Sequence, residues 1–151
     1  MLKKFDDPSM FGRIHHGFLN DKKKLSSLKT HINKYEFTEI AEGDVCWIED
    51  KNEIIPFMLH PRSFNRLPNM NSIKAGLKNG SIISLSEILE SEFNDILYII
   101  ELKSGVGDTY KALEKIIFLL ESKAKGRYWI DTFSPVLLKI VKEISPGSPT
   151  S

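Results

Sequence analysis

Residues 96–103 read Ile-Leu-Tyr-Ile-Ile-Glu-Leu-Lys, and this stretch decides the fold class. Its first part, residues 96–102, is an almost continuous apolar run, and it ends in charge. A strand of this composition needs cover on both faces, which is typical of a parallel sheet flanked by helices. The charged end is then expected at the carboxyl edge of the sheet, where such folds place their sites.

The segments on either side alternate between short strand-like runs and helical patterns. Strand formers gather in residues 11–15, 37–48, 53–59 and 127–133, and apolar residues at helical spacing begin at about Asp21 and are clearest at Leu113, Ile116, Ile117 and Leu120. This alternation predicts an α/β fold of βαβ units with a mainly parallel sheet. The chain holds about four such units, where a closed (β/α)₈ barrel uses eight and about 250 residues.

Local signals predict where several elements begin. Residues 50–52, Asp-Lys-Asn, have the composition of a hairpin-like turn. Ser84 and Glu87 have the spacing of a capping box, which predicts a short helix that runs through residue 89. Ser134 followed by Pro135 predicts an N-cap with proline at the first helical position.

Other signals predict irregular structure. Proline, glycine and asparagine are frequent in residues 61–80, which we therefore expect to form a long irregular loop. Gly105 and Gly107 are expected to end the apolar strand. We expect one partial α/β domain over residues 1–146 and a disordered tail over residues 147–151.

Composition excludes several classes of protein. The 151 residues carry 21 basic and 20 acidic side chains, so the net charge is 21 − 20 = +1, which argues against a nucleic-acid-binding protein. The apolar runs are far shorter than the roughly 20 residues that span a bilayer, and the N-terminus lacks the apolar region of a signal peptide. We expect a cytoplasmic protein. The single cysteine, Cys46, lies in an apolar run and is expected in the core.

Two pairs of charged residues have the spacing of side chains on one face of a strand. Glu42 and Asp44 are two residues apart, so both carboxylates project the same way. Hard oxygen ligands of this kind suit Mg²⁺ or Ca²⁺, although solvated charges on an exposed strand have the same pattern. Glu101 and Lys103 repeat this spacing at the end of the apolar strand. They either belong to a functional site at the carboxyl edge of the sheet or form a salt bridge at its rim.

Histidines stand where strands are expected to end. His15 ends the first predicted strand and His60 ends the third, and each could act as a general acid or base near neutral pH. A structural role is the alternative for both. His16 would point to the opposite face from His15, and His31 falls in the middle of a predicted helix.

Taken in order, these residues resemble the glycerophosphodiester phosphodiesterase family. The family has H-R-G after its first strand, E-x-D-V on its second, then H-D, a P-x-L-x-E-x-L helix start, E-x-K on the next strand and later S-F. The corresponding strings here are His15-His16-Gly17, Glu42-Gly43-Asp44-Val45, His60, residues 82–89, Glu101-Leu102-Lys103 and Thr132-Phe133. The resemblance covers about residues 12–146 and the first half of the family's barrel.

The resemblance implies a partial TIM-barrel-type fold, with about four of eight βα units, and the hydrolysis of a glycerophosphodiester to an alcohol and glycerol phosphate, a reaction of lipid metabolism. Carboxylates that correspond to Glu42, Asp44 and Glu101 hold a divalent cation in the family. Histidines that correspond to His15 and His60 are the family's acid and base, and Lys103 corresponds to a lysine that helps to hold the substrate.

The sequence also departs from the family pattern. His16 stands in place of the arginine that would bind phosphate, and Pro61 in place of the aspartate. The alternatives are therefore a degenerate relative that binds without turnover, or a related lipid phosphodiesterase of the sphingomyelinase D type. Because half a barrel leaves a sheet face and two edges open, we also expect either a homodimer formed through the open sheet or a poorly soluble chain.

Overall fold

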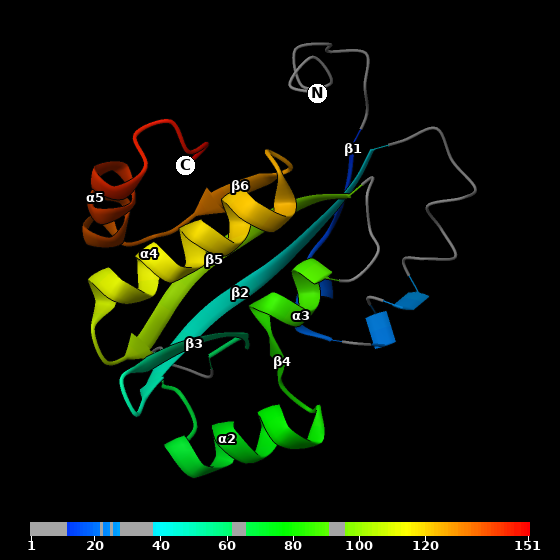
Figure 1. Ribbon diagram of the computed structural model, residues 1–151. Helices are drawn as coiled ribbons and strands as arrows, with labels where there is room; N and C mark the ends of the chain where they lie inside the picture. Colours follow the sequence, from blue (N-terminus) through cyan, green and yellow to red (C-terminus); the bar gives the residue numbers. More distant parts are fainter. Residues whose placement is uncertain (1–11, 22, 25, 28–37, 62–65, 91–95) are drawn as a thin grey trace.

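The computed structural model describes residues 12–21, 23, 24, 26, 27, 38–61, 66–90 and 96–151. This part of the chain forms a mixed sheet with helices packed against it (Figure 1). The strands are β1 (Gly12–His15), β2 (Thr38–Asp50), β3 (Glu53–Met58), β4 (Ile83–Ser84), β5 (Ile96–Val106) and β6 (Tyr128–Asp131). The helices are the short η2 (Phe18–Asn20), α2 (Met70–Asn79), α3 (Leu85–Glu90), α4 (Thr109–Leu119), the π-helical turn η4 (Leu120–Ala124) and α5 (Pro135–Ile144).

The long strand β2 is the centre of the sheet because it pairs with three other strands. β5 runs parallel to it along one edge, and β6 runs parallel to β5. Along the other edge, β1 is parallel beside residues 38–41, and β3 is antiparallel beside residues 45–50. β4 pairs antiparallel with β3. The prediction of a mainly parallel α/β sheet is confirmed for β1, β2, β5 and β6, to which the β2–β3 hairpin adds an antiparallel part.

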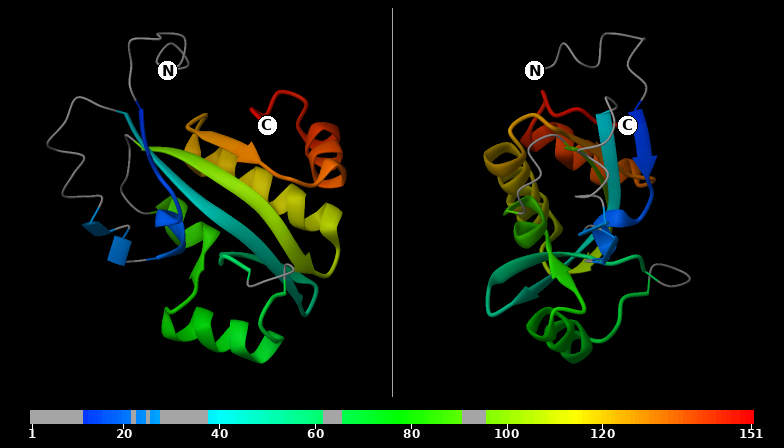
Figure 2. Two further views of the ribbon diagram at one scale, coloured as in Figure 1. Left: turned by 180° about the vertical axis from the view of Figure 1, so that it is seen from behind. Right: turned by 90° about the vertical axis from the view of Figure 1, so that its right-hand side faces the viewer.

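The main core lies between the sheet and the helices α3, α4 and α5, which cover one face (Figures 1 and 2). Every second residue of β2 and β5 points into this core, as the period of two in a strand requires. The buried strand residues of this face include Ala41, Val45, Trp47, Tyr98, Ile100 and Leu102, and α4 contributes Leu113, Ile116, Ile117 and others. We call this the helix-covered face, and the opposite side the inner face.

Helix starts follow the local signals. In the predicted capping box, the Ser84 N–H donates to Glu87 Oε2 at 2.9 Å, and the Glu87 N–H donates to Ser84 Oγ at 3.2 Å. The predicted cap of α5 is also confirmed, because Ser134 Oγ accepts from the Leu137 N–H at 3.3 Å and Pro135 is the first helical residue. Of the helix predicted from Asp21, residues 23, 24, 26 and 27 are helical, and the rest lies outside the described residues.

The expectation of an irregular loop over residues 61–80 is wrong for its second half, which forms α2. Asn69 caps this helix by accepting from the Ser72 N–H at 2.9 Å, and Gly80 ends it with a φ of 79°. α2 packs against a second apolar cluster on the inner face, formed by Cys46, Ile48, Phe57 and Ile73 with partly buried neighbours. The helix therefore exists because it has this apolar surface to cover.

β5 continues through Gly105 and ends at Val106, so the predicted end is confirmed at Gly107 and not at Gly105, and the strand contains a bulge. Val45 pairs with Leu102 but Trp47 pairs with Gly105, so β5 has one residue more than β2 between these pairs. Gly105 is thereby turned to the helix-covered face, where a Cβ would lie 2.3 Å from atoms of the Trp47 ring. The indole packs against the bare α-carbon, and only glycine leaves room for it.

The tail also differs from its predicted disorder. Thr150 forms a parallel bridge with Ile130 at the outer edge of β6. The Ile130 N–H donates to the Pro149 carbonyl at 2.9 Å, and the Ser151 N–H donates to the Ile130 carbonyl at 3.1 Å. The buried Ser148 hydroxyl lies 3.2 Å from the Tyr128 hydroxyl. Residues 149–151 thereby satisfy backbone groups that the edge of β6 would otherwise expose.

No helix in the described ranges is both long enough and apolar enough to span a bilayer.

Candidate functional site

Three carboxylates converge on the inner face of the sheet. Glu42 and Asp44 come from β2 and Glu101 comes from β5, and the register pairs Asp44 directly with Glu101. Each residue offers an oxygen that lies within 4.8 Å of the other two. The residues that were chosen from their i, i+2 spacing therefore lie together, on neighbouring parallel strands.

Asp44 is the most enclosed of the three, with 3% of its surface exposed. Its carboxylate Oδ2 accepts a hydrogen bond from Asn20 Nδ2 at 2.6 Å, and its own backbone N–H donates to Asn20 Oδ1 at 2.9 Å. The amide of Asn20 thus holds both the main chain and the side chain of Asp44. Because both ends of this pairing are fixed, the carboxylate has one defined direction.

Lys103 neutralises part of the cluster. Its Nζ lies 3.1 Å from Asp44 Oδ1 and forms a short ion pair with Glu101 Oε1, so the rim salt bridge exists and includes a third residue. Burial opposes the charge of this ammonium, but hydrogen bonds to Glu101 and Asp44 outweigh it and raise the pKa of Lys103. The ammonium also lies 5.7 Å from the centre of the exposed Phe133 ring.

Lys103 lies on the inner face by the same two-residue alternation as Glu101, and a bulge in β5 begins beside it. Lys103 is one of the two residues that lie between the Val45–Leu102 and Trp47–Gly105 pairs. Bulges are frequent beside active sites, and this one changes the faces of the residues that follow Lys103. Here the side chain of Lys103 stays on the inner face with Glu101, while the strand beyond it changes register.

Glu42 is held by the turn that follows β1. The Gly17 N–H donates to Glu42 Oε2 at 2.7 Å. Gly17 has a φ of 67°, in the left-handed region that glycine adopts without strain. His16 Nδ1 lies 3.5 Å from the same oxygen, and the His16 side chain is 81% exposed. His16 therefore lies beside the cluster but is not enclosed by it.

For the two histidines expected to act as acid and base, the structure describes both backbones but only the side chain of His60. His15 is the last residue of β1 and pairs with Ala41 of β2, while its side chain lies outside the described part of the structure. His60 is exposed and follows β3, and the neighbouring Leu59 N–H donates to the Asp44 carbonyl at 3.0 Å. The β2–β3 hairpin thus returns the chain to the level of the cluster beside His60, and the β1–β2 pairing places the backbone of His15 opposite Ala41, the residue before Glu42.

Sequence reasoning did not find Asn20 or Thr132. Thr132 Oγ1 donates to the Leu102 carbonyl at 3.1 Å and accepts from the Ser134 N–H at the same distance, which ties the loop after β6 to β5 beside Lys103. The resemblance included Thr132 only as part of a motif. For Asn20 the one signal was an amide, able to donate and accept, three residues after the glycine of the first motif.

Cys46 lies beside the cluster but is a core residue, as expected. It is fully buried, and its Sγ donates to the Leu59 carbonyl at 3.3 Å. Burial raises the pKa of the Cys46 thiol from 9.0 to about 11. The thiol is therefore protonated at neutral pH and offers no nucleophile.

Comparison with known proteins was made by sequence and by structure. No family model matches the sequence, and a search of the curated proteins finds no match. By structure, the chain is similar to a protein from Silicibacter pomeroyi assigned as a glycerophosphoryl diester phosphodiesterase, with a TM-score of 0.67 and 14% identity over 96% of this chain and 65% of the other.

Two further solved structures share this fold. A glycerophosphodiester phosphodiesterase from Parabacteroides distasonis has a TM-score of 0.60 and 16% identity, over 92% of this chain and 63% of the other. A protein from Galdieria sulphuraria, assigned to the same activity, has a TM-score of 0.62 and 17% identity, over 95% and 65%. The chain thus has the fold of these proteins, as the motifs indicated, and spans less than two thirds of the length of each.

Proposed function

We propose that the chain is a metal-dependent phosphodiesterase of the glycerophosphodiester type, which hydrolyses a small phosphodiester to glycerol phosphate and an alcohol. The observation that carries the proposal is the meeting of Glu42, Asp44, Glu101 and Lys103 on the inner face of this fold. The motifs in the sequence and the similarity to three solved structures of this type support it.

The donor set fits a divalent cation. Three carboxylates and one ammonium have a formal charge of −3 + 1 = −2, which one Mg²⁺ or Ca²⁺ would balance. Carboxylate oxygens are the ligands that both ions prefer. Glu42, Asp44 and Glu101 would hold the ion, which when bound supplies positive charge to the non-bridging oxygens of a phosphodiester.

The protein's own residues would supply the remaining chemistry. Lys103, whose pKa is raised by its two carboxylate partners, stays protonated and attracts the anionic substrate. One of His15 and His60 would accept the proton of the attacking hydroxyl, and the other would donate a proton to the leaving alkoxide. Overall one water is consumed, one phosphorus–oxygen bond is broken and one is formed.

The first experiment measures the metal site. Calorimetry with Mg²⁺ and Ca²⁺ should show one bound ion, and Glu101→Gln should weaken its binding well over tenfold because it removes one of three charged ligands. Glu114→Gln, at an exposed position of α4, is the matched control and should bind as the wild type does. Equal affinity in wild type and Glu101→Gln would remove the metal site.

The second experiment measures turnover of glycerophosphocholine and of a bis-aryl phosphodiester, with each ion and with chelator. Metal-dependent hydrolysis that Glu101→Gln abolishes is the expected result. Binding of the ion without turnover would instead favour the degenerate binding protein, which is the second candidate because His16 and Pro61 replace the family's arginine and aspartate. A cytoplasmic location stays a prediction of the sequence.

A further inference from the structure

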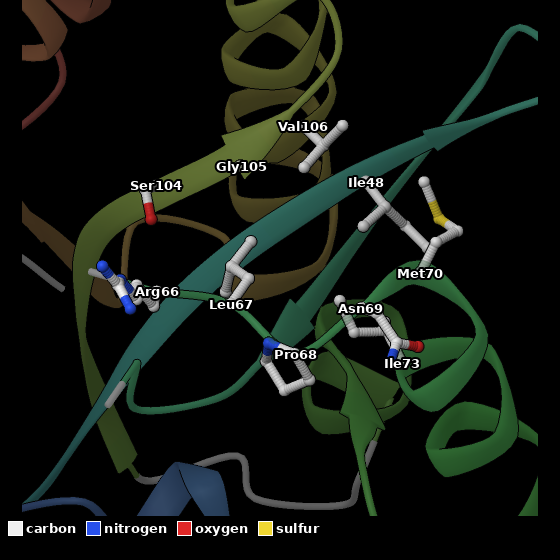
Figure 3. Close-up of a pocket in the computed structure, with 10 residues that line it drawn as sticks. All are labelled: Ile48, Arg66, Leu67, Pro68, Asn69, Met70, Ile73, Ser104, Gly105 and Val106. Atoms are coloured by element: carbon white, nitrogen blue, oxygen red, sulfur yellow. The ribbon is translucent and has the colours of Figure 1, made fainter. Parts of the chain in front are cut away.

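A cavity of about 480 Å³ lies between the inner face of the sheet and the segment that leads into α2 (Figure 3). The carboxyl ends of β2 and β5 form one wall, and residues 66–70 with Ile73 form the other. Most of its lining is apolar and includes Ile48, Leu67, Met70, Ile73 and Val106, and its polar side chains are Arg66, Asn69 and Ser104. Neither the carboxylate cluster nor Lys103 belongs to this lining, so the cavity is a separate feature.

The cavity begins beside the cluster and extends away from it. Ser104 lines the cavity and directly follows Lys103, whose ammonium contacts Asp44. Ile48 lies on the same face of β2 as Asp44 and four residues beyond it, which is about 13 Å along a strand. A molecule bound at the cluster would therefore have the cavity open to one side, along the direction of β2.

The two ends of the cavity differ in polarity. Figure 3 shows Arg66 and Ser104 at one end, and at the other Met70, Ile48 and Ile73 together with Asn69. Because Ser104 adjoins Lys103 in the chain, the polar end is the one next to the cluster. The charged group of a ligand would thus meet Arg66 and Lys103, and its uncharged part would meet apolar side chains and the amide of Asn69, whose Oδ1 already accepts from the Ser72 N–H.

We infer that this cavity binds a hydrocarbon chain that is attached to the phosphodiester, so that the preferred substrates are amphiphilic phosphodiesters in which one of the two alcohols carries an alkyl or acyl chain. The inference rests on the proposed function for the position of the phosphate. A small hydrophilic head group would leave the apolar end filled with water, whereas a hydrocarbon chain would displace that water and gain the free energy of apolar burial.

The direct test is binding of alkyl phosphates of increasing length, from ethyl to decyl phosphate, by calorimetry below their micelle concentrations. Affinity should rise roughly three- to fourfold per methylene until the chain fills the apolar end. The series is measured with Mg²⁺ and again with chelator, so that the contribution of the cavity is separated from that of any bound ion. An affinity that does not change with chain length would overturn the inference.

Variants locate the bound chain. Val106→Glu places a carboxylate in the cavity wall at a position that is 51% exposed and thus tolerant of charge, and it should abolish the dependence on chain length. Val136→Glu, in α5 at a position that is 66% exposed and outside the cavity, is the matched control and should keep it. Met70→Gln, at a partly exposed position of the opposite wall, repeats the test. An unchanged slope in both cavity variants would overturn the inference.

Turnover separates this inference from the proposed function. The kcat/KM for 1-hexanoyl-glycerophosphocholine should exceed that for glycerophosphocholine at least tenfold, because several methylenes enter the cavity. Equal hydrolysis of both would overturn the inference and leave the proposed function intact. Binding that depends on chain length without any hydrolysis would sustain the cavity assignment and count against the enzyme.

Discussion

Asn20→Ala tests whether Asp44 is held in place by its amide partner. The substitution removes a hydrogen bond from Asn20 Nδ2 to a carboxylate and another from the buried Asp44 N–H to Asn20 Oδ1. A hydrogen bond to a charged group contributes about 1.5–3 kcal/mol and a neutral one about 0.5–1.5 kcal/mol. We therefore expect the free energy of unfolding to fall by about 3 kcal/mol, and the Tm to fall by about 6–12 °C.

The assay is urea unfolding followed by fluorescence, with Asn79→Ala as the matched control. Asn79 Oδ1 accepts one exposed hydrogen bond from the Ser81 N–H, so its loss should cost less than about 1 kcal/mol. Calorimetry on the same Asn20→Ala protein should also show Mg²⁺ binding weakened about 10- to 100-fold, as for the loss of a group that orients a ligand. If Asn20→Ala were no more destabilised than Asn79→Ala, the two hydrogen bonds would not have the role given to them.

Three further predictions follow from the site and the sheet. His15→Ala and His60→Ala should each lower kcat by roughly 10²–10⁴ with the fold intact, whereas His31→Ala should have little effect. His16→Arg should raise the activity. Equal small losses at His15, His60 and His31 would contradict the acid and base roles of the first two. With its pKa raised from 9.0 to about 11, the Cys46 thiol has about 100-fold less thiolate at a given pH, so iodoacetamide at pH 8 should react at least that much more slowly with folded than with urea-unfolded protein. Because the thiol ionises less readily in the folded protein, its contribution to the free energy of unfolding is fully present below pH 9 and is lost as the pH rises through about 11. Equal alkylation rates in folded and unfolded protein would argue against the raised pKa. The tail pairs with the edge of β6 and α2 covers only part of the inner face, so we still expect the rest of that face to drive association; light scattering at micromolar concentration should show a homodimer, and a soluble monomer would refute that expectation.

The sequence was sufficient where the signal is local. The capping box of Ser84 and Glu87 is complete within four residues, and the cap at Ser134 needs only the proline that follows. The converging carboxylates were also predictable, because two residues on one face of a strand and a third at the end of its parallel neighbour need no long-range detail. Only the pairing of the two strands had to be assumed.

The sequence was insufficient where a distant partner decides the structure. α2 forms in a stretch rich in helix breakers because its apolar side covers Cys46 and Phe57. The tail is ordered because Ile130 offers an open strand edge, and Asn20 matters because its loop places it against a residue 24 positions later. For α2 the chain does carry a signal, because Met70, Ile73 and Leu77 have helical spacing after Asn69, but the glycines and asparagines around them favoured a loop. The contacts of the tail and of Asn20 leave no periodic trace in the chain.

The extra residue in β5 has a consequence for how this region tolerates change. It shifts the phase of the strand's two-residue alternation, so Gly105 lies under Trp47 and Val106 lines the cavity. Deletion of Ser104 would leave one residue between Leu102 and Gly105, so the bulge would be lost while Gly105 stayed opposite Trp47. Insertion of one more residue before Gly105 would instead bring a residue with a side chain to this position, where a Cβ would lie too close to the indole. This part of β5 should therefore tolerate the loss of a residue better than the gain of one, and Gly105→Val should be as harmful as the insertion.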